Sequence, residues 1–226
     1  MIPRYLTPTC PPTASPPHQL RNLWRSNVRN SRAQVHALAE QLCSLALPLL
    51  PECNAWGLSN MLHSISSLPA NATLLRLAGA LVARAQPQLA NFTNQGLANT
   101  AWALATLRMN CSFTAPPVFL DALVAASKSQ AHLFNAQGVS NLIWSLAKLQ
   151  HYNKALMEAL LTAAMPQLAE FDPQGLANMA WALATLGHKS PLFTDALLVA
   201  SQPQLGSFNP QGLANTAWAL ATLDHR

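Results

Sequence analysis

One segment recurs along this chain, and this repetition constrains the fold more than any other feature. Residues 209–223 read Asn-Pro-Gln-Gly-Leu-Ala-Asn-Thr-Ala-Trp-Ala-Leu-Ala-Thr-Leu; three earlier segments are similar, and a fifth copy farther upstream is more divergent. The glycine of the motif lies at positions 57, 96, 138, 175 and 212, so successive units are 37–42 residues apart. A period in this range is typical of stacked supersecondary units. The sequence therefore predicts a repeat array.

Each unit is expected to begin with a helix that carries the motif. In the unit that starts near residue 92, Asn94 is the expected N-cap of a helix over 95–107. Asp172 and Asn209 recur near the same place, and each is followed by a proline, which suits the first helical turn. The leucines and alanines of this helix form two adjacent apolar stripes, as expected for a helix packed between neighbouring units.

A second helix is expected in each unit. The predicted second helices span 74–86, 117–130, 154–165 and 191–202, and a recurrent proline ends or kinks most of them. Segment 35–50 has the same pattern without a first helix before it. A phenylalanine four residues before the glycine is expected to fill the junction between units, at Phe92, Phe134, Phe171 and Phe208.

These patterns predict an all-α fold, a right-handed α-solenoid of helix-turn-helix repeats of about 37–42 residues. The array is expected to span 34–226, with units that begin near residues 53, 92, 134, 171 and 208. No second helix follows Leu223 in the last unit. The array is therefore expected either to be part of a longer protein or to dock onto a protein partner through the uncovered motif helix of this unit.

Residues 1–33 have a different composition and carry the charge excess. This segment is rich in Pro, Ser and Thr, and five arginines in it account for the net charge of +5, whereas residues 33–226 are neutral. Such a composition favours an organellar transit peptide, with a basic disordered tail as the alternative. We expect a chloroplast location, with the mitochondrion as the alternative.

Other functional classes find little support in the sequence. Cys10, Cys43, Cys53 and Cys111 are scattered without metal-site spacing, so neither a metal nor another cofactor is expected. No apolar run approaches the length of a membrane helix, and no membrane association is expected. No carboxylate pair, nucleophile–base pair or phosphate loop is recognisable, so the sequence does not predict an enzyme.

A large ring recurs at one register position of the motif. Trp102, Trp144, Trp181 and Trp218 occupy it, with His63 in the divergent copy. Such rings could form a stacking platform for nucleobases. The flanking alanines favour the other interpretation, a row of core side chains.

A polar stripe follows one face of the motif helix. Its first position is always Asn, and the second and third positions lie four and seven residues later. Stacked units would align these side chains as a ladder able to contact base edges or sugar hydroxyls, whereas the Asn residues could instead cross-link adjacent repeats. The candidate RNA-binding residues are Asn60, Ser64, Ser67, Asn99, Ala103, Thr106, Asn141, Ser145, Lys148, Asn178, Ala182, Thr185, Asn215, Ala219 and Thr222.

The segment Phe-Asn-Pro-Gln-Gly-Leu-Ala-Asn-Thr-Ala-Trp-Ala-Leu-Ala-Thr-Leu at 208–223 resembles the octotricopeptide repeats of green algae, which often precede a RAP domain. The resemblance covers about 49–226 and implies a helical-hairpin array that binds organellar RNA and governs its maturation, stability or translation. The chain departs from this class because it has no RAP-like C-terminal segment and its array is neutral.

Together, these observations favour a sequence-selective protein that binds single-stranded organellar RNA along the polar stripe. The alternative is a protein–protein interaction scaffold of the same architecture, whose groove takes a peptide or a partner helix.

Overall fold

The computed structural model describes residues 33–224, and this part of the chain consists of helices and turns without a β-strand. The prediction of an all-α fold is confirmed. Residues 33–46 are helical and continue into the 3-10 helix η1 (Leu47–Glu52). The predicted basic segment, with the proposed transit peptide, lies outside the described residues except for its last position.

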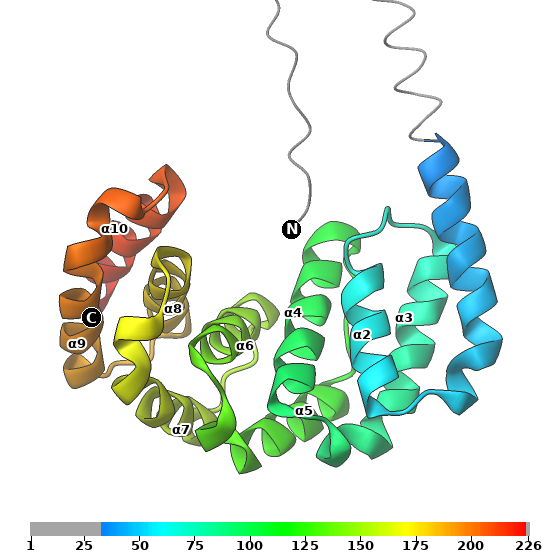
Figure 1. The fold of residues 1–226 in the computed structure, drawn as a ribbon, viewed down its shortest axis with the longest axis horizontal. Helices are drawn as coiled ribbons and strands as arrows, with labels where there is room; N and C mark the ends of the chain where they lie inside the picture. Colours follow the sequence, from blue (N-terminus) through cyan, green and yellow to red (C-terminus); the bar gives the residue numbers. More distant parts are fainter. Residues whose placement is uncertain (1–32, 225–226) are drawn as a thin grey trace, which may run out of the picture.

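The remaining helices form two rows that follow one arc (Figure 1). The inner row carries the repeated motif and consists of α2 (Ala55–Ile65), α4 (Asn94–Cys111), α6 (Ala136–Leu149), α8 (Pro173–Leu186) and α10 (Pro210–Asp224). The outer row consists of α3 (Ala72–Ala85), α5 (Pro117–Ser129), α7 (Lys154–Ala164) and α9 (Pro191–Ser201). Each inner helix packs most extensively against a neighbouring inner helix. The predicted second helices match the outer row to within two residues at either end.

Short 3-10 helices connect the outer helices to the next inner helix. They are η2 (Gln86–Asn91), η3 (Ala131–Leu133), η4 (Met165–Glu170) and η5 (Gln202–Ser207). In η2, η4 and η5 a proline occupies one of the first two positions, as it also does in η1. Since proline has no N–H to donate, it favours the end of the α-helix at this point.

All five described inner helices begin with the same hydrogen bond. The side chain three residues before the motif glycine accepts from the glycine N–H at 2.7–3.1 Å; the accepting residues are Asn54, Thr93, Asn135, Asp172 and Asn209. The expected caps Asp172 and Asn209 are confirmed. The expected cap Asn94 is wrong, because Asn94 is only two residues before Gly96 and already lies within the helix.

The core lies between the two rows. Leu97, Leu104 and Leu107 of α4 are fully buried, together with the alanines that flank them. Phe92, Phe134, Phe171 and Phe208 are buried at the unit boundaries, as predicted. Burial of apolar surface stabilises the array by roughly 25 cal/mol for each Å² removed from water.

Backbone carbonyls at the start of three units are satisfied by glutamines near the end of the same unit. The Nε2 groups of Gln130, Gln167 and Gln204 donate to the carbonyls of Phe92, Phe134 and Phe171, at 2.8, 3.1 and 3.1 Å respectively. Arg84 donates in a similar way to the carbonyls of Leu50 and Pro51. These contacts link the end of each outer helix, or the segment just after it, to the residues just before the inner helix of the same unit.

Candidate ligand-binding groove

A groove follows the inner row. Its largest section has a volume of about 450 Å³ and is lined by side chains from α4, α6, α8 and α10. A smaller section of about 230 Å³ lies between α4 and α6, and Asn141 lines both sections. The groove therefore crosses consecutive repeats.

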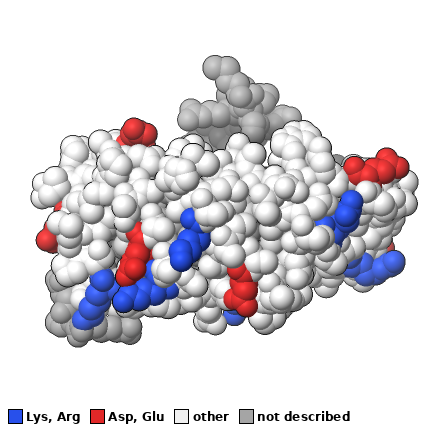
Figure 2. Space-filling view, turned by 90° about the horizontal axis from the view of Figure 1, so that it is seen from below, with Lys and Arg blue, Asp and Glu red and all other residues white. Residues whose placement is uncertain are grey.

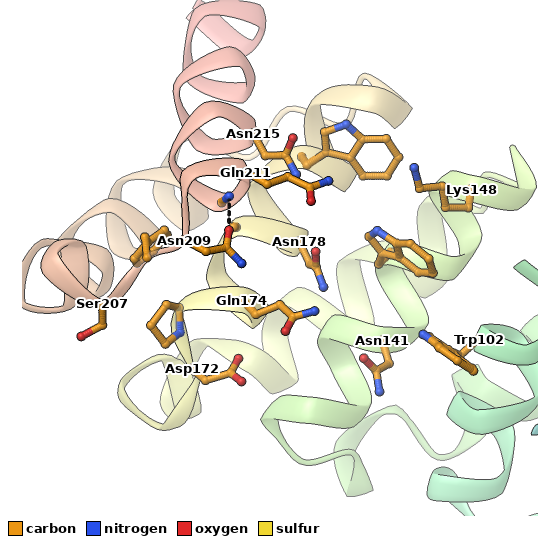
Figure 3. Close-up of a pocket in the computed structure, with 16 residues that line it drawn as sticks. Trp102, Asn141, Lys148, Asp172, Gln174, Asn178, Ser207, Asn209, Gln211 and Asn215 are labelled. Carbon is orange, nitrogen blue, oxygen red and sulfur yellow. Dashed lines mark hydrogen bonds between the residues drawn. The ribbon is translucent and has the colours of Figure 1, made fainter. Parts of the chain in front are cut away.

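Each inner helix carries three side chains at positions i, i+4 and i+7, which share one face of a helix. All three of these side chains line the groove in α4, α6 and α8, and the first two line it in α10. We call this set the groove ladder; in the four closely similar units it consists of Gln, Asn and Trp. Its members are Trp56, Asn60 and His63; Gln95, Asn99 and Trp102; Gln137, Asn141 and Trp144; Gln174, Asn178 and Trp181; and Gln211, Asn215 and Trp218. Figure 3 shows the labelled amides of Asn141, Gln174 and Asn178 projecting into the same space.

The asparagines of the ladder are half-buried, and their amide groups make no hydrogen bond to another protein group within residues 33–224. At Asn60 and Asn141 only the backbone carbonyl accepts a side-chain hydrogen bond, from the hydroxyls of Ser64 and Ser145 respectively, and the side-chain amide takes no part in it. The glutamines of the ladder are exposed and likewise have no protein partner among the described residues. Cross-linking of adjacent repeats by these asparagines is therefore not observed, and their donors and acceptors face the groove.

The second position of the predicted stripe faces the neighbouring inner helix rather than the groove. Ala103, Ser145, Ala182 and Ala219 are each 0% exposed, and only Ser64 at the divergent end is exposed. Small side chains at this position let consecutive inner helices approach closely. In this conformation the four buried residues do not reach a ligand in the groove.

The third position is mixed. Ser67 and Thr185 are exposed, Lys148 and Thr222 are half-buried, and Thr106 is buried. The Thr106 hydroxyl has no hydrogen-bond partner in the described chain. Of these five residues, only Lys148 lines the main section of the groove.

The tryptophans are not core side chains in the sense expected. Trp102, Trp144 and Trp181 are half-buried and line the groove, and Trp218 is 47% exposed. Each of the first three rings is therefore covered in part by protein and accessible in part from the groove. The sequence favoured the core interpretation of these rings over the stacking platform. It also left the glutamines unnoticed, although their position four residues before each Asn was a usable signal.

Lys148 is the one Lys or Arg that lines the described groove. Its Nζ lies 4.2 Å from the ring centroid of Trp181 and 5.5 Å from that of Trp144, which are cation–π distances (Figure 3). Asp172 also lines the groove, where its carboxylate caps α8. By contrast, Lys, Arg, Asp and Glu side chains are interspersed on the face seen from below Figure 1 (Figure 2).

The described residues contain no cluster of three or more His, Cys, Asp or Glu positioned for a metal ion. Within the same part of the chain, no helix combines the length and apolar character that crossing a membrane requires. A comparison with models of known protein families gave no match, and no curated protein was found to match the chain.

Proposed function

We propose that this protein binds single-stranded RNA along the groove ladder and is a helical-repeat protein of the octotricopeptide type. The observation that carries the proposal is the row of amide side chains that have no hydrogen-bond partner among residues 33–224, interleaved with half-exposed aromatic rings. Amides can pair with the Watson–Crick and Hoogsteen edges of unstacked bases, and indole rings can stack on their faces. A repeated Gln–Asn–Trp set suits a ligand that itself repeats.

The charge of the groove predicts how such binding would respond to salt. Each phosphate neutralised on a single strand contributes a slope of about −0.7 in the logarithm of affinity against the logarithm of salt concentration. With Lys148 as the groove cation in the described chain, we expect a slope of about −1 or shallower. Affinity would then come mainly from stacking and amide hydrogen bonds, which favours selectivity between sequences over general attraction to RNA.

The proposal also covers the architecture of the array and its location in the cell. We propose that the helix pairs form a right-handed α-solenoid, and that residues 1–33 direct the protein to the chloroplast or, alternatively, the mitochondrion. There it would act in the maturation, stability or translation of organellar RNA. Fusion of residues 1–33 to a fluorescent protein tests the targeting, and a cytosolic distribution of the fusion would contradict it.

Crosslinking in cells tests the central proposal. Ultraviolet crosslinking and purification of the full chain should recover RNA, and a variant with Asn141, Asn178 and Asn215 all changed to Ala should recover far less. A matched control changes Gln130, Gln167 and Gln204 to Ala, since these glutamines make unit-boundary contacts outside the ladder. Recovery of a protein partner without RNA from the parent would favour the scaffold alternative.

A further inference from the structure

The five rings of the groove ladder are separated by four intervals along the array, which we call gaps. Within residues 33–224, two of these gaps are closed by a contact and two are open. At the first gap, His63 and Trp102 contact one another directly, with ring centroids 4.8 Å apart. At the third gap, the ammonium group of Lys148 lies between Trp144 and Trp181. No aromatic or cation–π contact closes the second gap, Trp102 to Trp144, or the fourth, Trp181 to Trp218, within the described chain.

The residue types at the third stripe position explain this difference. Lys148 is four residues after Trp144, and its long side chain reaches the ring of the next unit. The equivalent residues Ser67, Thr106, Thr185 and Thr222 are too short to place a group between two rings. Lys148 also has no carboxylate within ion-pair distance among residues 33–224, where the ion pairs are His151–Asp121 and Lys154–Glu158.

We propose that Lys148 is a wedge that excludes a nucleobase from the gap between Trp144 and Trp181 and binds the RNA phosphate that passes over it. An ammonium over the ring of Trp181 occupies the place that a stacked base would need, and the cation–π contact itself stabilises this arrangement. Bases can enter the gaps on either side. The groove therefore takes an RNA whose stacked nucleotides are interrupted at one register position, and it tolerates any base, or none, at that position.

This inference rests on the proposed RNA-binding function, and an abasic scan tests it separately. A short RNA enriched by the full-length protein from a random pool is remade with one nucleotide at a time lacking its base. Loss of a stacked base should weaken binding by about 5- to 150-fold. For the parent protein we expect one tolerant position, with sensitive positions on both sides.

Two variants test the role of Lys148, one that removes this lysine and one that adds a second lysine in the next repeat. Lys148→Thr installs the residue of the neighbouring units; it should make the tolerant position sensitive and make the salt slope shallower by about 0.7. Thr185→Lys adds a lysine at the equivalent position of α8 and should create a second tolerant position one repeat away. The far-ultraviolet circular dichroism and melting temperature of both variants should match the parent, because neither position is fully buried.

The outcomes separate the two proposals. If the pool yields no enriched RNA and the parent binds none, the RNA-binding function fails and the wedge fails with it. If the parent binds an enriched RNA but Lys148→Thr and the parent give the same abasic profile, the function stands and the wedge is wrong.

Discussion

The amide nitrogen of Gly175 donates to Oδ1 of Asp172 at 2.7 Å, and a Cβ added at residue 175 would lie 2.9 Å from the same oxygen. The same added atom would lie 3.3 Å from the ring of Phe171. Glycine is thus required at position 175 by the close approach of two neighbours, the helix cap and the junction phenylalanine. A side chain at this position must displace at least one of them.

We therefore expect Gly175→Ala to destabilise the protein by about 1 kcal/mol or more, since the lost cap outweighs the gain in helix propensity. Gly79→Ala is the matched control, because Gly79 lies within α3 and an added Cβ there meets nothing within 4 Å. This control should raise stability by up to about 1 kcal/mol. Urea denaturation measures both, and equal effects of the two changes would contradict the explanation.

Trp181→Ala should weaken RNA binding more than it weakens folding. Removal of this half-buried ring should lower the free energy of unfolding by about 1–2 kcal/mol, less than the 3–5 kcal/mol typical of removing a fully buried Trp. Loss of the ring that borders the gap between Trp181 and Trp218, where a base can stack, should reduce RNA affinity by about 1–3 kcal/mol. Leu183→Ala, at a core position of the same helix, should show the reverse pattern when assayed below its melting temperature. Calorimetry and fluorescence anisotropy provide the two readouts, and unchanged RNA affinity in Trp181→Ala would argue against the platform.

Two glutamines one short segment apart should have opposite roles. Gln167 donates from Nε2 to the carbonyls of Phe134 and Ala163, so Gln167→Ala should destabilise the fold by about 1 kcal/mol. Gln174→Ala should leave stability unchanged and weaken RNA binding, because Gln174 lines the groove and has no protein partner in the described chain. Thermal melts and RNA titrations of both variants test this separation. It fails if either glutamine affects both properties equally.

His188 predicts a dependence of stability on pH. It is buried at 7% exposure, its Nδ1 lies 2.9 Å from the Tyr152 hydroxyl, and burial lowers the pKa of the imidazole below its ordinary value. Glu158 opposes this pKa shift and Lys154 reinforces it, and Lys189 also lines the surrounding pocket. Because the unfolded chain binds the proton more readily, this contribution to stability is complete above about pH 6.5 and is lost as the pH falls toward the lowered pKa.

The measurement is the free energy of unfolding at a series of pH values for the parent and for His188→Gln. The parent should lose stability below about pH 6.5, and the variant should show a flatter profile over the same range. Parallel profiles would mean that other groups cause the acid sensitivity. An increase in the parent's stability on acidification would contradict the sign of the argument.

Local sequence patterns were sufficient to predict the helices and most of their ends. The recurrent glycine, the cap three residues before it, and the proline after most of the outer helices act within one or two turns, so their effects can be inferred without knowledge of distant contacts. The apolar positions of the motif predicted burial of Leu97 and Leu104, and the phenylalanines predicted the junctions. The one misplaced cap, Asn94, arose because two neighbouring polar residues could both accept the bond and only Thr93 is in register with Gly96.

The groove was decided by tertiary structure. The inner helices are apolar around much of their circumference, so periodicity alone does not establish which stripe meets the next helix and which remains open. The size of the side chains decides which stripe is buried. The small alanines at positions 103, 182 and 219 fit between adjacent helices, whereas the larger Trp and Asn side chains beside them are only partly buried or exposed. The position of Lys148 between two rings depends on the spacing of α6 and α8. That spacing is set by contacts between repeats, which no single repeat contains.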